Sequence, residues 1–156
     1  MRQAICNQLV QIEQEHRICI LYAVESGSRA WGFASRDSDY DVRFIYIHPL
    51  DWYLSIRDQR DVIECPIDHE LDVSGWDLRK ALGLFAKSNP PLLEWLGSPI
   101  VYKDSNGLAD RLRCLLIETF SSQRCMYHYL HMARGNYREY LKGEIVGDVT
   151  ISLTRC

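Results

Sequence analysis

The chain has 156 residues, of which 47% are hydrophobic and 11% aromatic, and its 18 Lys/Arg and 21 Asp/Glu give a net charge of −3. This length suits one domain with a substantial core, and the composition excludes a disordered chain. No apolar run is long enough to cross a membrane, and the N-terminus (MRQAICNQLVQIEQEHR) is amphipathic rather than a signal peptide, so we expect a cytoplasmic protein. The six cysteines form no C-x-x-C pair, which argues against a disulfide framework and a structural zinc site.

Apolar periodicity and turn residues divide the chain into alternating helices and strands. Segments with apolar residues three and four apart are predicted as helices, and uncharged or alternating runs as strands. Residues 51–56 fit a helix or a loop. In chain order we predict a helix over 2–15, a strand over 18–24, one or two helical turns over 29–33, strands over 40–47, 62–65 and 67–73, a helix capped by Ser74, a short helix from Asn89 to Gly97, a strand over 100–102, and one bent or two separate helices from 108 onward.

This order predicts an α/β (α+β) fold in which a small mixed β-sheet with packed helices precedes a helical region. We expect a single compact domain with an α/β core over 1–104, a helical extension over 105–143 and an atypical tail over 144–156. In the tail, Val149 and Leu153 belong to an alternating pattern that could form an edge strand seeking a protein partner.

Two aspartates stand at the start of the second predicted strand. Asp39 and Asp41 are two residues apart, so in a strand their side chains share one face. Such a pair repels itself unless a cation neutralises it, and hard oxygen ligands suit Mg²⁺ bound together with phosphates. Glu70 and Asp72 repeat this spacing on another predicted strand. A third carboxylate from that strand would complete a site for two metal ions.

A Gly-Ser turn supplies a complementary phosphate site. Gly27 lets the backbone approach a ligand closely, and Ser28 offers a hydroxyl and main-chain N–H groups. The ten residues between Ser28 and Asp39 are enough for a short helix and a turn back into the strand. Arg29 and Arg36 either contact phosphates or balance the charge of the acidic residues.

The Gly-Ser turn, the ten-residue spacer and the sequence DYDV resemble the signature of the polymerase-β-type nucleotidyltransferase superfamily. The longer strings GSRAWGFASRDSDYDVRFIYIHPLDWYL, ELDVSGWDLRKAL and HMARGNYREYL are similar to predicted nucleotidyltransferases associated with RNA repair. The resemblance covers about residues 15–143. It implies an enzyme that uses Mg²⁺ or Mn²⁺ to transfer a nucleoside monophosphate from a triphosphate such as ATP to an acceptor hydroxyl, with RNA or tRNA ends as the acceptor class.

The resemblance also assigns roles to residues. It implies that Gly27 and Ser28 hold the triphosphate, that Asp39 and Asp41 bind metal, and that Asp72 is the third carboxylate, which helps to deprotonate the acceptor. Glu70 is the alternative for the third position. After about Gly143 the sequence EIVGDVTISLTRC departs from the family, so we expect a truncated or divergent C-terminal end.

Three functional hypotheses follow from the sequence. The first is the enzyme just described. The second is a nucleotide-binding partner or regulatory subunit without turnover, of the toxin–antitoxin or phage-defence type. The third is a decayed fragment with neither role. The acidic balance of charge argues against strong non-specific nucleic-acid binding, so a small molecule or a protein hydroxyl also stays open as the acceptor.

Overall fold

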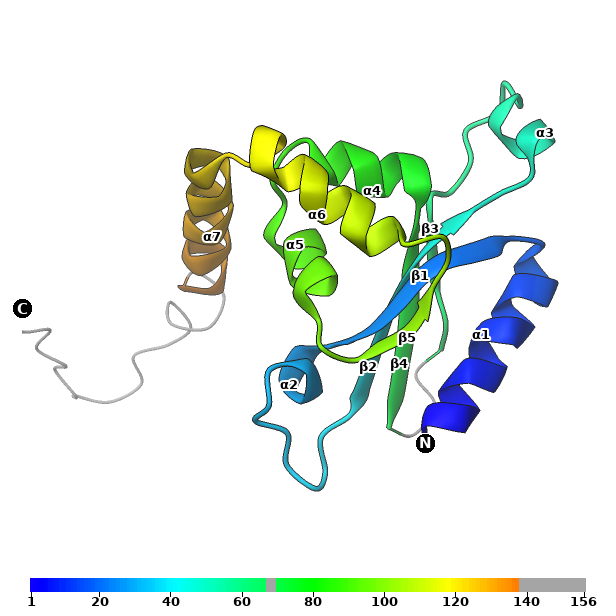
Figure 1. Ribbon diagram of the computed structural model, residues 1–156, viewed down its shortest axis with the longest axis horizontal. Coiled ribbons are helices and arrows are strands. Elements are labelled where there is room, and N and C mark those ends of the chain that lie inside the picture. Colours follow the sequence, from blue (N-terminus) through cyan, green and yellow to red (C-terminus); the bar gives the residue numbers. More distant parts are fainter. Residues whose placement is uncertain (67–69, 138–156) are drawn as a thin grey trace, which may run out of the picture.

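The computed structural model describes residues 1–66 and 70–137, which form a five-stranded sheet with helices on both faces (Figure 1). The strands are β1 (Cys19–Ser26), β2 (Tyr40–Ile47), β3 (Val62–Glu64), β4 (Leu71–Asp77) and β5 (Val101–Asp104). The helices are α1 (Arg2–His16), α2 (Gly27–Ala30), α3 (Leu50–Tyr53), α4 (Leu78–Phe85), α5 (Pro90–Gly97), α6 (Leu108–Thr119) and α7 (Ser122–Asn136). None of these helices is both long and apolar enough to cross a bilayer.

The sheet is mixed, with the strand order β3-β4-β2-β1-β5. The central pair β2 and β4 is parallel, whereas the other neighbouring strands are antiparallel. Figure 1 shows α1 alone on one side of the sheet, α4, α5 and α6 on the other, and α7 beyond α5. The predicted α+β architecture, a small mixed sheet with packed helices, is therefore confirmed.

Alternation along β2 decides which side chains face which layer. Val42, Phe44 and Tyr46 belong to the core cluster under α1, whereas Ile45 belongs to the cluster under α4, α5 and α6. Because side chains two apart share a face, Asp41 and Arg43 lie on the same side as Ile45. The charged residues at the start of this strand therefore face the layer of α4–α6.

Two segments differ from the sequence prediction. The strand predicted to end at Val73 continues as β4 to Asp77, and it begins only at Leu71. Ser74 is consequently a strand residue, and Asp77 is the residue that caps α4, since its side chain accepts a hydrogen bond from the Arg79 N–H at 2.8 Å. The strand continues through Ser74 because register pairing with β2 holds it there. Residue 67 lies outside the described residues.

The helical region is two helices, α6 and α7, separated at Phe120 and Ser121. Ala109 and Leu112 of α6 are buried in the core cluster on the helix side of the sheet. This part of the chain is thus continuous with the α/β core. The predicted tail over 144–156 lies outside the described residues, and the five cysteines that the structure describes are unpaired.

Candidate active site

The Gly-Ser turn and two of the predicted carboxylates meet at one edge of the sheet, where β1 ends and β2 and β4 begin. Ser26, the last residue of β1, pairs with Asp41 in the antiparallel register. On the other side, Asp41 pairs with Asp72 in the parallel register. Ser26 and Asp72, which are more than forty positions apart along the chain, therefore lie on either side of Asp41 across three adjacent strands.

Gly27 has a steric reason to be glycine. Its φ of +67° lies in the left-handed region, and a Cβ built on it would stand 2.2 Å from Oδ2 of Asp41. A side chain at this position is thus excluded both by backbone conformation and by the carboxylate. The turn and Asp41 are therefore packed in direct contact. Helix α2 begins at Gly27 itself and has only four residues, so it is shorter and earlier than predicted.

Arg43 lies between the two paired carboxylates. Its Nη2 donates to Asp72 Oδ2 at 2.7 Å and to Asp41 Oδ1 at 3.2 Å, and its Nη1 donates to the Asp72 carbonyl at 3.1 Å. The sequence analysis did not select Arg43. Its position two residues after Asp41, on the same strand face, was the signal that could have found it.

The carboxylate of Asp41 is held under electrostatic stress. Burial raises the pKa of Asp41 above its ordinary value, Arg43 opposes this by lowering the pKa, and Asp72 and Asp39 raise it further. The two like charges destabilise the ionised form, and one guanidinium stabilises it. The ionised carboxylate of Asp41 thus has one stabilising partner, Arg43, against burial and two like charges.

Asp39 lies just outside this arrangement. It precedes β2, which begins at Tyr40, and its side chain is exposed. Its carbonyl accepts a hydrogen bond from Arg29 Nε at 3.1 Å. In residues 1–66 and 70–137 no three His, Cys, Asp or Glu side chains lie close enough together to form a metal-binding group, so Asp39 is not gathered with Asp41 and Asp72.

The other predicted residues have different surroundings. Glu70 is an exposed turn residue before β4, so it does not share a strand face with Asp72, and its carbonyl accepts the Tyr40 N–H at 2.6 Å. Arg29 binds the carbonyls of Ser38 and Asp39, and its guanidinium stacks on the Tyr40 ring. It therefore holds the loop 31–39 in place. Arg36 is exposed on that loop.

Glu25 is a second residue that the sequence analysis missed. Its side chain is fully buried, its Oε1 accepts the Asp41 N–H at 2.8 Å, and its Oε2 accepts the Tyr102 hydroxyl. A buried carboxylate with two fixed donors is a rigid support. Glu25 thereby fixes the backbone at the start of β2, where Asp41 is attached. Its place directly before Ser26 and the Gly-Ser turn was the available signal.

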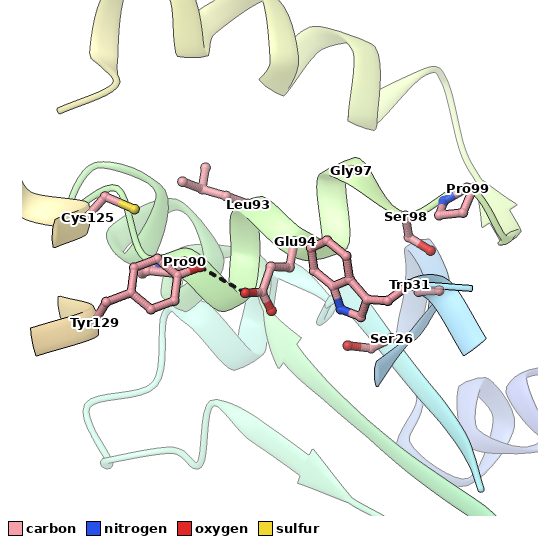
Figure 2. A pocket seen from close by; sticks show the side chains of 11 residues that line it. Ser26, Trp31, Pro90, Leu93, Glu94, Gly97, Ser98, Pro99, Cys125 and Tyr129 are labelled. Carbon is pink, nitrogen blue, oxygen red and sulfur yellow. Dashed lines mark hydrogen bonds between the residues drawn. The ribbon is translucent and has the colours of Figure 1, made fainter. Parts of the chain in front are cut away.

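A hollow of about 300 Å³ opens beside the turn, on the side of the sheet that Asp41 and Arg43 face. We refer to it as the helix-side hollow. It is lined by residues in or next to α2, α5 and α7 and at the end of β1, among them Ser26, Trp31, Glu94, Ser98 and Tyr129. Figure 2 shows the Trp31 indole on one side, Tyr129 on the other and Glu94 between them. The Tyr129 hydroxyl donates to Glu94 Oε1 at 3.0 Å. An aromatic, mostly apolar hollow with few polar groups is a typical small-molecule site.

Comparison with known proteins identifies the family. A sequence profile of the RNA repair pathway DNA polymerase beta family (RlaP) matches residues 1–150. The chain belongs to this family. The resemblance drawn from the motifs is thereby confirmed, and the match begins before and ends after the residues 15–143 that carried it. Membership supports a polymerase-β-type nucleotidyltransferase associated with RNA repair.

The chain is also similar to a curated relative. The uncharacterized protein YcgL of Bacillus subtilis (strain 168) is 58% identical over 146 residues, which cover 94% of this chain and 56% of the relative. The chain therefore spans little more than half the length of that relative. No solved structure matches the chain.

The side chains at the sheet edge fit the divalent cation that the family implies. Asp41 and Asp72 supply hard carboxylate oxygens, and both already share one cationic partner, Arg43. Mg²⁺ commonly takes one or two carboxylates and completes its ligands with water and substrate phosphates, so two carboxylates suffice without a full protein cage. Asp39 is a further carboxylate close enough to raise the pKa of Asp41.

Proposed function

We propose that this chain binds a nucleoside triphosphate at the Gly-Ser turn and transfers its nucleoside monophosphate to a hydroxyl at an RNA end. The observation that supports this most directly is the meeting of the turn, Asp41 and Asp72 across three adjacent strands. In the reaction, the acceptor oxygen forms a bond to the α-phosphorus, and the bond from the α-phosphorus to the oxygen that bridges it to the β-phosphate breaks. Pyrophosphate leaves, and the hydroxyl proton passes to a base.

The Gly-Ser turn would hold the phosphates. The first N–H groups of α2 have no partner inside so short a helix, and Gly27 has no side chain to keep a ligand away. Ser28 adds a hydroxyl. Arg43 lies on the same sheet edge, where its guanidinium can pair with phosphate oxygens once it leaves the carboxylates.

Asp41 and Asp72, with Asp39 as a candidate further ligand, would hold Mg²⁺ or Mn²⁺. The cation, when bound, would neutralise phosphate charge and polarise the oxygens of the transferred group. Asp72 is the best candidate for the base that accepts the acceptor proton. It is one third exposed, and it lies at the open end of β4 where an acceptor can approach.

The helix-side hollow would take the nucleoside part of the triphosphate. It adjoins the turn through Ser26, and Trp31 offers a ring that is 58% exposed. Aromatic faces stack on every nucleobase, so the ring alone does not choose among the four bases. Ser98 and Glu94 line the same hollow and could select by hydrogen bonding.

The test is a transfer assay with each α-labelled triphosphate, Mg²⁺ and total RNA. We expect label on RNA with the wild-type chain, and loss of both triphosphate binding and transfer with Asp41→Asn. Asp72→Asn should keep binding but slow transfer by about a hundredfold or more, as expected for loss of a general base. Asp110→Asn, a change at an exposed aspartate of α6, is the matched control and should behave as wild type.

The outcomes distinguish the three hypotheses. Label on RNA supports the enzyme. Triphosphate binding that needs Asp41, without label on RNA, protein or a small molecule, would favour a nucleotide-binding regulatory subunit. Absence of binding and of transfer under every triphosphate would contradict both.

A further inference from the structure

A second hollow, of about 380 Å³, lies on the opposite side of the sheet from the helix-side hollow. We refer to it as the α1-side hollow; Arg2, Glu25, Arg29, Tyr40 and Tyr102 line it. Tyr40 and Tyr102 pack at the edge of the core cluster under α1. Its size falls within the range of small-ligand sites, and its lining is more polar and more basic than that of the helix-side hollow.

Two arginine–tyrosine stacks shape this hollow. The guanidinium carbon of Arg29 lies 3.7 Å from the centre of the Tyr40 ring, and that of Arg2 lies 5.3 Å from the centre of the Tyr102 ring. Each arginine is also anchored by backbone carbonyls: Arg29 by those of Ser38 and Asp39, and Arg2 by that of Val101. Each guanidinium group is therefore held near an aromatic ring and a backbone carbonyl, which lowers the entropy cost of binding a ligand against it.

The charge of the α1-side hollow favours a nucleic-acid ligand. Glu25 is the acidic residue of its lining, and both of its carboxylate oxygens already accept hydrogen bonds, from Asp41 N–H and from the Tyr102 hydroxyl. The two guanidinium groups leave a net positive rim. Because the whole chain carries a net charge of −3, affinity has to come from such a local site rather than from a general basic surface.

The α1-side hollow is joined to the carboxylate site by direct hydrogen bonds. Glu25 lines it and also accepts the N–H of Asp41, and Arg29 lines it and donates to the carbonyl of Asp39. The start of β2 thus separates the two hollows. A triphosphate on the helix side and a second substrate on the α1 side would approach the same edge from opposite faces.

We propose that the α1-side hollow binds the terminal nucleotides of the single-stranded RNA that accepts the transferred group. This inference rests on the proposed function and names its acceptor site. Single-stranded RNA is recognised by stacking unpaired bases on aromatic side chains and on arginine guanidinium planes, which is the arrangement found here twice. Arg2 and Arg29 would serve as base-stacking planes and as partners for the adjoining phosphates.

The test measures RNA binding apart from chemistry. A fluorescein-labelled single-stranded RNA of about 8 nucleotides is titrated with the full chain, without metal or triphosphate, and followed by anisotropy. Arg2→Ala should weaken binding about fivefold or more, as loss of one base-stacking contact does. Arg111→Ala, a change at an exposed arginine of α6, removes the same charge elsewhere and should leave affinity unchanged. Equal affinities for these two variants would overturn the proposal.

Two further variants keep the test decisive. Arg2→Lys keeps the charge but removes the planar group, and it should bind RNA more weakly than wild type. Trp31→Ala, in the helix-side hollow, should weaken triphosphate binding and leave RNA binding unchanged. RNA binding that responds to Trp31→Ala and not to Arg2→Ala would place the RNA in the other hollow. If the wild type bound no triphosphate while its Arg2-dependent RNA binding was intact, the proposed function would be refuted and the RNA site would stand.

Discussion

The two ends of strand β4 each carry an aspartate, and the two carboxylates meet opposite surroundings. Asp72, at the start of the strand, is one third exposed and is bound by the side chain of Arg43. Asp77, at the end, is fully buried; it accepts the Tyr53 hydroxyl at 2.6 Å and the Arg79 N–H at 2.8 Å. Asp72 is thus accessible to other partners, whereas Asp77 is sealed from solvent. We call the start of β4, at Asp72, its open end and the end at Asp77 its closed end.

This difference separates a structural carboxylate from a candidate functional one. The donors to Asp77 are the hydroxyl of the half-buried Tyr53 and a backbone N–H of α4, and both are positioned by the fold itself. The donor shared by Asp72 and Asp41 is the side chain of one arginine, Arg43, whose place a cation would take in the proposed function. The same residue type therefore caps a helix at one end of the strand and forms a partly exposed ion pair at the other.

The largest expected effect is on stability, at the closed end. Asp77→Ala removes the N-cap of α4 and leaves the Tyr53 hydroxyl without its acceptor, so we expect a loss of about 3 kcal/mol in the free energy of unfolding. Asp72→Ala, at the open end of the same strand, should cost less than about 1 kcal/mol, since it also removes a like-charge neighbour of Asp41. Urea titrations of both variants measure the free energy of unfolding. Equal losses in Asp77→Ala and Asp72→Ala would contradict the distinction between a structural and a candidate functional aspartate.

The next effect lies at the contact between the turn and Asp41. Gly27→Ala places a Cβ 2.2 Å from the Asp41 carboxylate in a left-handed conformation, so we expect a loss of about 2 kcal/mol and weaker triphosphate binding. Gly83→Ala is the matched control, because nothing lies within 4 Å of a Cβ at that helical position. That control should gain up to about 1 kcal/mol. If both variants had the same stability and the same triphosphate affinity, the close packing of turn and carboxylate would have no functional meaning.

Local sequence signals predicted much of this molecule. The bounds of β2 were read correctly because an apolar run lies between the turn Asp37-Ser38 and Pro49. The close placement of Gly27 and Asp41 followed from a motif whose spacing is local. Ser74 was misassigned because it and Asp77 are both good helix caps, and only pairing with β2 decides that the strand continues through Ser74.

The features that could not be predicted depend on strand register. Arg43 meets Asp72 only because β2 and β4 pair in parallel with Asp41 opposite Asp72. Glu25 supports Asp41 only because β1 and β2 pair so that its side chain reaches the Asp41 N–H. No spacing within one segment contains this information. The separation of Asp39 from the other two carboxylates is likewise a matter of where β2 begins.

A smaller effect is expected at Arg43, where stability and metal binding should change in opposite directions. Arg43→Met removes the shared cation, so the metal-free chain should lose about 1 kcal/mol. The same change removes the competitor of the divalent cation, so affinity for Mn²⁺, measured by calorimetry without a triphosphate, should rise. Arg60→Met breaks an exposed pair with Glu64 and should alter neither quantity. Weaker Mn²⁺ binding in Arg43→Met would show that Arg43 assists the metal instead of replacing it.

The smallest expected effect returns to the closed end, at His48, whose ring stacks on Trp52 with 4.0 Å between ring centres. Burial lowers the pKa of His48 below its ordinary 6.5, although Asp77 opposes this. Above about pH 7.5 both the folded and the unfolded chain hold this histidine neutral. As the pH falls through the unfolded value of 6.5, the unfolded chain takes up a proton that the folded chain resists. The wild type should therefore lose stability between about pH 7.5 and 5.5 relative to His48→Gln, by less than about 1 kcal/mol. Thermal melts across this range measure the difference, with His131→Gln on α7 as the exposed control. A wild type that gained stability over His48→Gln on acidification would mean that the pull of Asp77 outweighs burial at this end of the strand.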